Sequence, residues 1–258
     1  YKIFMNIEGN IFLTGCEGQL GMAISKKLAS KRNNIFGMDI SAESKNNYLT
    51  KYLKGSVTDR KSFSQLFDLL NYEENPCSFT LINNAGFSVF TPSEERTVDE
   101  FKQVTEVNML GPLFGMTEFF LYIQALRKTY GNLENFYSII NIASVYGMIS
   151  PNKKIYSDTK RSNSEIYGAS KAGLIQMTKY FATRYADVPI TVNSVSPGGI
   201  LNENLQGEEF ISNYSKLVPM NRLSKDYEIA DVIKMLINTK NEYLTGQNIA
   251  VDGGMTSW

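Results

Sequence analysis

Short apolar runs alternate with amphipathic stretches along almost the whole chain, and this alternation restricts the fold more than any other feature. The predicted strands are 10–13, 35–39, 52–57, 79–82, 137–143, 190–195 and 248–251, and the predicted helices are 20–29, 61–70, 98–108, 113–130, 164–185 and 227–237. Strands joined through helices form parallel sheets by right-handed crossovers, with helices on both faces. We therefore expect an α/β fold with a doubly wound, seven-stranded parallel sheet, formed as a single domain by residues 1–258.

The composition narrows the chemistry that such a fold can perform. The chain of 258 residues has no histidine, which excludes His-based triads and a His general base. Its two cysteines, Cys16 and Cys77, are too few for a zinc site, so we expect no metal and two reduced thiols in a cytoplasmic protein. The 26 basic and 26 acidic side chains balance, so neither nucleic acid nor a membrane surface is an expected partner.

The longest apolar runs and the start of the chain bear on where the protein is located in the cell. No apolar run is long enough to cross a bilayer, and residues 1–6 lack a secretory pattern. The sequence does not begin with methionine, and Met5 is one candidate for the native start.

Residues 14–21, Thr-Gly-Cys-Glu-Gly-Gln-Leu-Gly, lie between the first predicted strand and the first predicted helix. A dinucleotide-binding turn requires this context, because glycines let the backbone approach a pyrophosphate and a helix N-terminus offers N–H donors. The alternative is a tight turn that merely needs glycine. Asp39 ends the second predicted strand, where a carboxylate accepts hydrogen bonds from ribose hydroxyls and repels a 2′-phosphate. The pattern favours NAD over NADP.

Tyr167 and Lys171 are four residues apart, so on a helix their side chains share one face. A phenol has a reference pKa of about 10, and a neighbouring ammonium group lowers it. The pair can therefore form a general acid/base that works near neutral pH. Ser144, which closes the fifth predicted strand, can place a hydroxyl beside the phenol. Taken alone, a tyrosine and a lysine at this spacing are more often a solvated helix face.

Together these motifs resemble the short-chain dehydrogenase/reductase family over nearly the whole chain. The resemblance lies in 14–21, Asp39, 83–86 (Asn-Asn-Ala-Gly), Asn108, Ser144, Tyr167 with Lys171, 197–199 (Pro-Gly-Gly), 245–246 and 251–254. It implies a Rossmann-type fold and an NAD(P)-dependent enzyme that interconverts a secondary alcohol and a ketone by hydride transfer. It also implies a homotetramer or homodimer formed through helices 113–130 and 164–185.

The resemblance assigns a role to individual residues. Tyr167 would be the general acid/base, Ser144 would orient the substrate oxygen, and Lys171 would hold the nicotinamide ribose. Asn108 would anchor a water in the proton relay, although its amide can equally satisfy backbone groups at a helix kink. The implied cofactor-binding residues are Thr14, Gly15, Gly18, Gln19, Leu20, Asp39, Ser56, Val57, Asn84, Ala85, Gly86, Tyr167, Lys171, Pro197, Gly198 and Ile200.

Three features depart from the family pattern. Gln19 stands where glycine is usual, and Ser56 stands where many relatives have an aspartate near the adenine. The glycine spacing is similar to that of a longer epimerase and dehydratase branch, but the Val-Asp-Gly-Gly ending favours the short branch without a second domain. Ser144 and Tyr167 are 23 positions apart, longer than usual, and the extra segment 149–163 is polar and locally basic.

The extra segment also bears on the substrate. Lys153, Lys154, Lys160 or Arg161 could meet an anionic sugar derivative at the mouth of the site, or could belong to an ordinary solvated loop. The segment, together with residues 144–147, 155–156 and 196–201, resembles the flagellin modification protein A subgroup, which is associated with nonulosonate sugar pathways. We therefore expect a small sugar-derived substrate, bound by Ser144, Tyr146, Tyr167, Lys153 and Lys154.

Two alternatives to a sugar oxidoreductase stay open. One is a reductase of 3-oxoacyl-carrier-protein or of a small ketone, for which a basic rim would suit an acidic carrier. The other is a cofactor-binding scaffold without turnover, which has no chemical need for Ser144, Tyr167 and Lys171 together.

Overall fold

The computed structural model describes residues 9–70, 78–131, 135–156 and 163–258. Within them, seven strands form one sheet in the order β3-β2-β1-β4-β5-β6-β7, and every pairing is parallel. The strands are β1 (Gly9–Thr14), β2 (Asn33–Asp39), β3 (Lys51–Lys54), β4 (Ser78–Asn83), β5 (Phe136–Ile142), β6 (Ile190–Pro197) and β7 (Asn248–Val251). The prediction of a doubly wound, seven-stranded parallel sheet in a single Rossmann-like domain is confirmed.

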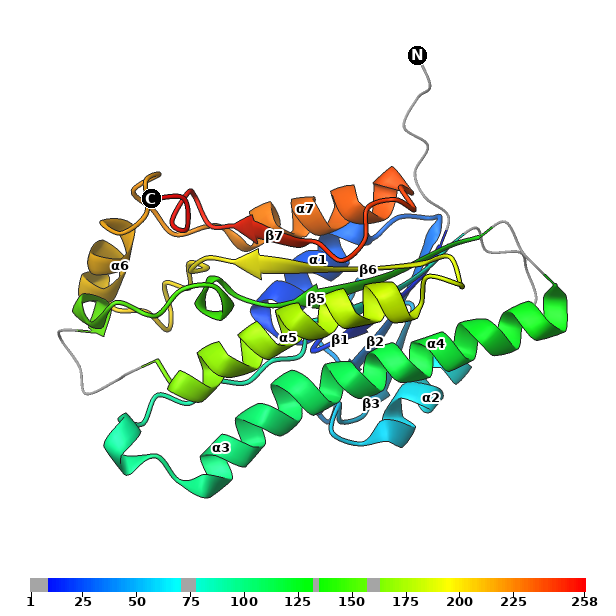
Figure 1. The fold of residues 1–258 in the computed structure, drawn as a ribbon, viewed down its shortest axis with the longest axis horizontal. Helices are drawn as coiled ribbons and strands as arrows, with labels where there is room; N and C mark the ends of the chain where they lie inside the picture. Colours follow the sequence, from blue (N-terminus) through cyan, green and yellow to red (C-terminus); the bar gives the residue numbers. More distant parts are fainter. Residues whose placement is uncertain (1–8, 71–77, 132–134, 157–162) are drawn as a thin grey trace, which may run out of the picture.

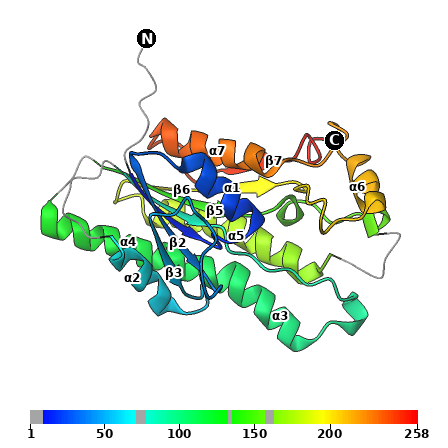
Figure 2. The same cartoon turned by 180° about the vertical axis from the view of Figure 1, so that it is seen from behind.

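Helices cover both faces of this sheet. They are α1 (Gln19–Leu28), α2 (Arg60–Asp68), α3 (Val98–Thr105), α4 (Gly111–Tyr130), α5 (Glu165–Arg184), α6 (Glu208–Ser215) and α7 (Asp226–Thr239). Helices α2, α4 and α5 lie on one face (Figure 1), and the view from behind shows α1 and α7 on the other (Figure 2). Because both faces are covered, the central strands are buried along their whole length and read in the sequence as continuous apolar runs.

The side chains of β1 show how the two halves of the core are separated. Phe12 packs into the cluster beneath α2, α4 and α5, where its ring lies edge-on to that of Phe67 at 4.9 Å between centroids. Ile11 and Leu13 point to the opposite face and join the cluster beneath α1 and α7. This alternation fixes the register of β1, since a slip by one residue would exchange the two sets.

The strand order places a ligand crevice at one edge of the sheet. β1 lies between β2 and β4, so the direction in which successive strands are added reverses at β1. Crossovers diverge at such a point and leave a crevice at the carboxyl ends of the strands. Here that crevice opens beyond Thr14 and Asn83, next to the glycine-rich turn.

The two helices predicted over 98–108 and 113–130 are in fact continuous. A π-helical turn, Glu106–Leu110, joins α3 directly to α4. Pro112 has no N–H to donate, and the wider turn just before it accommodates the missing hydrogen bond. The prediction of two separate helices is therefore wrong.

The joined helix, Val98–Tyr130, is long and apolar enough to cross a bilayer by length and composition alone, contrary to the sequence-based expectation. Its Met116, Phe119 and Ile123 are fully buried against the sheet. The helix thus packs as the core helix of a soluble protein does.

Two strand ends and one further helix also differ from the prediction. The third strand ends at Lys54, so Gly55, Ser56 and Val57 leave the sheet instead of extending it. β6 continues to Pro197, two residues beyond its predicted end. Helix α6 was not predicted, and it packs in a separate small cluster with Val145, Ile155, Tyr214, Val218, Leu223 and Met255.

Candidate active site

A cavity of about 440 Å³ lies beyond the carboxyl ends of β1, β2 and β4. Most of the predicted cofactor-binding residues line it: Gly15, Gly18, Leu20, Asp39, Ser56, Val57, Asn84, Ala85 and Gly86. Thr14 and Gln19 are not among its lining residues. The buried Thr14 hydroxyl instead accepts hydrogen bonds from the backbone N–H groups of Asn84 and Ala85, at 3.1 Å each, and so joins the ends of β1 and β4.

The glycine-rich turn fits a pyrophosphate. A Cβ on Gly21 would lie 2.2 Å from the carbonyl oxygen of Gly15. Gly15 has a φ of +65°, and a Cβ there would lie 2.8 Å from the Cα of Ala85. The N-terminus of α1, with Gly18 as its N-cap, has no side-chain cap. Its first N–H groups are therefore available to an anion and carry the positive end of the helix dipole.

Two carboxylates line the same cavity, Asp39 and Glu17. One Asp39 oxygen accepts from the Glu17 N–H at 3.1 Å, and the other accepts from the backbone and hydroxyl of Ser41 at 3.1 and 3.0 Å. Glu17 in turn accepts from the backbone N–H of Lys45 at 2.9 Å. No lysine or arginine occurs among the described residues that line this cavity, so its charge opposes an additional phosphate group.

A second cavity, of about 360 Å³, continues from the first along the ends of β5 and β6. Leu20, Asn84, Gly86 and Phe87 line both cavities. The remaining walls of the second cavity include Ser144, Tyr167, Lys171, Pro197, Gly198 and Ile200. Residues separated by up to 180 positions in the sequence therefore meet at the end of one continuous crevice, as the sequence predicts.

Tyr167 lies in the first turn of α5, where the Ser164 hydroxyl accepts a hydrogen bond from its backbone N–H at 3.2 Å and caps the helix. Burial raises the pKa of the Tyr167 phenol above its ordinary value, and a hydrogen bond with the Ser144 hydroxyl offsets part of that rise. A phenol with a raised pKa stays protonated at neutral pH. It is therefore ready to donate a proton to a substrate oxygen.

Lys171 lies one turn further along α5 and is only 3% exposed. Burial lowers the pKa of its ammonium group to about 8. The Nζ atom donates to the carbonyl oxygen of Ile142 at 2.8 Å and lies 5.7 Å from the centre of the Tyr167 ring. The expectation that Lys171 brings the pKa of Tyr167 below 10 is therefore wrong for the protein alone, because desolvation of the phenol dominates.

Asn108 occupies the π-helical turn and is completely buried. Its amide nitrogen donates to the carbonyl of Phe87 at 2.8 Å and to the Ser170 hydroxyl at 3.0 Å, and its amide oxygen accepts from the N–H of Phe87 at 2.8 Å. Both amide hydrogens are thus used within the protein. The geometry favours the alternative role, in which Asn108 holds the 86–88 backbone beside α5.

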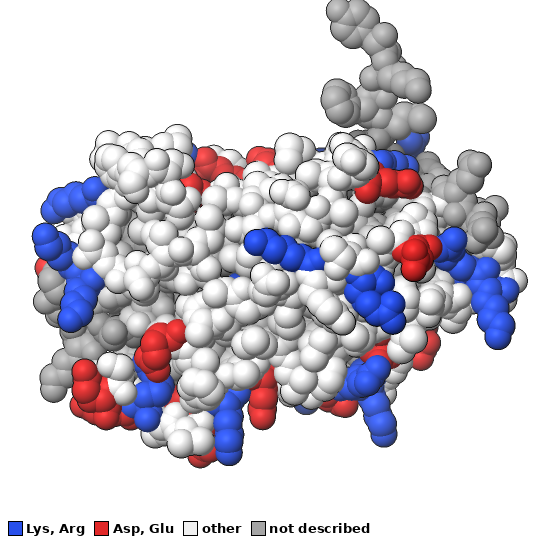
Figure 3. Space-filling model, in the orientation of Figure 1, with Lys and Arg blue, Asp and Glu red and all other residues white. Residues whose placement is uncertain are grey.

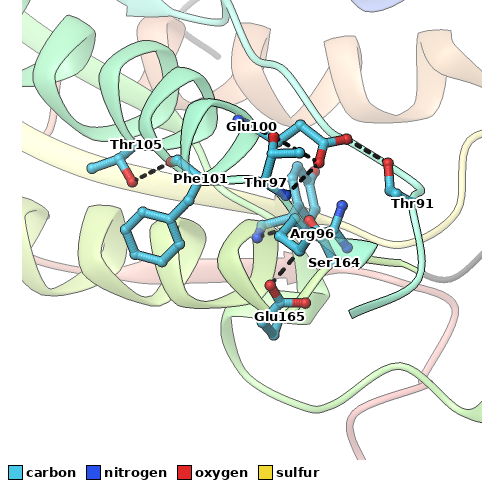
Figure 4. A network of polar contacts seen from close by, with 9 residues as sticks. Thr91, Arg96, Thr97, Glu100, Phe101, Thr105, Ser164 and Glu165 are labelled. Atoms are coloured by element: carbon cyan, nitrogen blue, oxygen red, sulfur yellow. Dashed lines mark hydrogen bonds and ion pairs between the residues drawn. The ribbon is translucent and has the colours of Figure 1, made fainter. Parts of the chain in front are cut away.

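A polar network holds the first turn of α5 against α3 (Figure 4). Thr97 and Glu100 form a capping box at the start of α3, and Glu100 also accepts a hydrogen bond from Thr91. The Arg96 side chain, only 6% exposed, pairs with Glu165 through Nε at 3.3 Å. Because Glu165 is two residues before Tyr167, this network fixes the turn that carries the phenol.

A third cavity, of about 260 Å³, adjoins the second at Ser88, Ser144, Tyr167 and Gly198. Six of its fourteen lining residues are aromatic: Phe90, Tyr146, Tyr156, Tyr167, Phe210 and Tyr214. None of the described residues that line it is charged. This is the expected place for a substrate, since Tyr167 separates it from the crevice.

The structure places the predicted substrate-binding residues differently. Tyr146 lines the third cavity as predicted, but Lys153 and Lys154 are exposed and do not line it. The extra segment contributes Tyr156 instead, because Ile155 is buried and turns the short helix Lys153–Tyr156 so that the two lysines face solvent. Lys160 and Arg161, like Cys77 and Met5, lie outside the described residues.

Four residues that line the third cavity were not predicted from the sequence: Gln206, Gly207, Phe210 and Tyr214. They precede or belong to α6, a helix of only eight residues whose Phe210, Ile211 and Tyr214 lie at helical spacing. The Tyr214 hydroxyl accepts a hydrogen bond from the N–H of Gly199 at 2.6 Å. The apolar spacing of Phe210, Ile211 and Tyr214 was the signal that could have predicted this helix.

A dinucleotide crevice that ends at a serine, a tyrosine and a lysine beside an aromatic cavity defines an oxidoreductase that acts on CH–OH groups. The comparisons with known proteins agree. A profile of the family described as "Enoyl-(Acyl carrier protein) reductase" matches residues 17–256. The chain belongs to the short-chain dehydrogenase/reductase family, whose members use nicotinamide dinucleotides.

The relatives act on varied substrates. The 3-oxoacyl-[acyl-carrier-protein] reductase of Thermotoga maritima is 30% identical, over 97% of this chain and 99% of its own. The 3beta-hydroxysteroid dehydrogenase 1 of Eggerthella lenta is 27% identical, over 95% and 93%. Among solved structures, a short chain dehydrogenase from Leptospira borgpetersenii with bound NAD+ is 31% identical, with a TM-score of 0.81 over 97% of this chain and 93% of that one.

Proposed function

We propose that the protein is an NAD-dependent oxidoreductase that interconverts a secondary alcohol and a ketone on a sugar-derived substrate. The observation that carries this proposal is the position of Tyr167, which lines both the crevice and the aromatic cavity. A bound nicotinamide would supply or accept the hydride. Tyr167 would give a proton to the carbonyl oxygen, Ser144 would orient that oxygen, and Lys171 would hold the ribose.

The third cavity supports a carbohydrate in particular. The C–H faces of a sugar ring pack well on aromatic side chains, and its hydroxyls need partners at fixed positions. The Ser88 hydroxyl is buried without a hydrogen-bond partner, the Tyr146 hydroxyl lies beside those of Tyr156 and Tyr214, and all four residues line this cavity. Buried polar groups are nearly always paired, so a ligand with several hydroxyls would complete them.

An anionic group on such a substrate would lie outside the cavity. The described lining residues are uncharged, whereas Lys153 and Lys154 lie on the same short helix as Tyr156 and face solvent. The two lysines would then meet a carboxylate or phosphate at the rim. The likeness of the extra segment to flagellin modification proteins supports a substrate from nonulosonate assembly.

Removing the hydroxyls of Ser88 and Tyr146 tests the carbohydrate assignment. For Ser88→Ala and Tyr146→Phe we expect kcat/KM for a sugar-derived substrate to fall about tenfold each, because a lost hydrogen bond in a desolvated site costs about 1–2 kcal/mol. Turnover of a simple cyclic ketone without hydroxyls should stay the same, which makes it the internal control. Equal losses on both substrates would contradict the assignment.

A carrier-protein reductase is the second candidate, since two lines of comparison favour it. The matching family description and the Thermotoga relative both name acyl-carrier-protein substrates. A steady-state screen of sugar acids, nucleotide sugars and a 3-oxoacyl pantetheine thioester, each with NADH and with NADPH, separates the two. Turnover of the thioester alone would replace the sugar proposal, and absence of turnover with all of them would favour a scaffold.

Asp39 is expected to select NAD. In Asp39→Ala we expect the ratio of kcat/KM with NADP to that with NAD to rise at least about tenfold, because a carboxylate near a 2′-phosphate repels it. Asp99→Ala, an exposed acid on α3, provides the matched control. An unchanged ratio would show that Glu17 or the shape of the cavity decides the preference.

The exposed faces of α4 and α5 support the proposal of a homo-oligomer. Figure 3 shows broad uncharged areas between widely spaced charged side chains on this side of the molecule. Leu121 on α4 and Tyr180 on α5 are exposed there, whereas Phe119 and Phe181 are buried in the core. We propose that these helices pair with those of a second copy of the chain.

We also propose that the enzyme works in the cytoplasm, where Cys16 is a buried, reduced thiol.

A further inference from the structure

We propose that Gln19 and Asn202 form a clasp across the coenzyme crevice, which must open whenever coenzyme enters or leaves. The inference rests on the coenzyme assignment made above, and it concerns a pair of side chains to which the catalytic mechanism gives no role.

The clasp is made by the side-chain amide of Gln19, the first residue of α1. Its Nε2 donates to the carbonyl oxygen of Leu201 at 2.8 Å, and its Oε1 accepts from Nδ2 of Asn202 at 3.0 Å. Both ends of the amide are thus engaged by the loop that follows β6. The two elements are more than 180 residues apart in the sequence and belong to opposite sides of the crevice.

The position of the clasp is fixed by its neighbours. Leu20, next to Gln19, lines the first and the second cavity, and Ile200, next to Leu201, lines the second. Gln19, Leu201 and Asn202 do not themselves line either cavity, so the clasp lies at the rim where the two cavities join. A dinucleotide that occupies both cavities has to pass this junction, so the two hydrogen bonds stand across its route.

The loop on the far side of the clasp is held as one unit. The backbone N–H of Asn202 donates to Oε1 of Gln206 at 2.9 Å, and Nε2 of Gln206 donates to the carbonyl oxygen of Ile200 at 2.9 Å. Gln206 also lines the aromatic cavity. Opening the clasp would consequently shift a wall of the substrate cavity together with the roof of the crevice.

The strength of the clasp suits a gate. Its two hydrogen bonds join neutral groups at the surface. The need to break them slows the opening of the clasp by about tenfold but does not prevent it. The family pattern has glycine where Gln19 stands, and glycine cannot form either bond. The gate is therefore a property of this chain.

Stopped-flow fluorescence of NADH binding tests the clasp. Because the proposed clasp closes the crevice both before coenzyme enters and after it has bound, we expect Gln19→Ala and Asn202→Ala to raise the association and dissociation rate constants together, by about fivefold to tenfold, and to leave Kd within about twofold. The double variant should be no faster than either single one, since both remove the same contact. Asn204→Ala, an exposed asparagine in the same loop, is the matched control and should behave as the unaltered protein.

Three results would overturn the proposal. A faster dissociation alone, with a weaker Kd, would show that Gln19 or Asn202 contacts the coenzyme instead of gating it. Unchanged rates in both variants would show that the clasp does not limit exchange. Failure of the unaltered protein to bind NADH or NADPH would overturn the coenzyme assignment as well, whereas normal binding with unchanged rates removes only the clasp.

Discussion

Replacing Tyr167 by phenylalanine is expected to lower kcat by about 1,000-fold, with NADH binding unchanged. General acid/base catalysis by a positioned side chain contributes about 10²–10⁴ in rate, and among the described residues that line both the crevice and the aromatic cavity Tyr167 alone carries a phenol, which is a stronger acid than a serine hydroxyl. The loss corresponds to about 4 kcal/mol of transition-state stabilisation. The phenylalanine ring keeps the packing of the cavity, so the folded structure should persist.

The measurement pairs steady-state kinetics with NADH titration by fluorescence. Tyr243→Phe is the matched control, since that side chain is 99% exposed and lies outside the site. A Tyr167→Phe variant that retains more than about a tenth of the activity would contradict the assigned role. Loss of NADH binding along with activity would instead mean that the hydroxyl serves the coenzyme.

Replacing Gly21 by alanine is expected to weaken NADH binding by about 100-fold and to lower the melting temperature. The new Cβ would lie 2.2 Å from the Gly15 carbonyl oxygen and within 3.0 Å of two backbone atoms of Cys16. Backbone atoms cannot move aside as a flexible side chain does, so the glycine-rich turn must separate from α1. Such overpacking costs about 1–3 kcal/mol in stability, and it disrupts the surface proposed to receive the pyrophosphate.

Gly173→Ala on α5 is the control for this experiment. Its Cβ would also come close to another atom, at 2.7 Å, but that atom is the terminal methyl group of Met109, which can turn away. Alanine also favours a helix by about 1 kcal/mol over glycine. We therefore expect Gly173→Ala to bind NADH normally and to melt no earlier. Normal NADH binding by Gly21→Ala would show that the turn does not form the coenzyme site.

The fold could be predicted because its signals are local. A strand buried on both faces must be apolar, and a helix that covers the sheet must carry apolar residues at helical spacing. Helix α6 carries such a signal over only eight residues, in Phe210, Ile211 and Tyr214, and it is held by long-range contacts such as the hydrogen bond of the Tyr214 hydroxyl with Gly199. Helices that depend on tertiary contacts are poorly predicted from sequence.

The candidate site was predictable where residue type and spacing decide the geometry. Ser144, Tyr167 and Lys171 meet because β5 and α5 are packed elements. The direction of the Tyr167 pKa was not predictable, since spacing reveals a neighbouring charge but does not reveal burial. The orientation of Lys153 and Lys154 was also hidden, because it depends on the burial of Ile155 between them and Tyr156.

The small cluster beneath α6 has a consequence for how this enzyme could diversify. It joins Tyr214, Val218, Leu223 and Met255 to Val145 and Ile155, and it shares no residue with the two cores that sandwich the sheet. Substitutions within this cluster can therefore change the wall that α6 gives to the aromatic cavity, without disturbing Tyr167 or the two cores that cover the sheet.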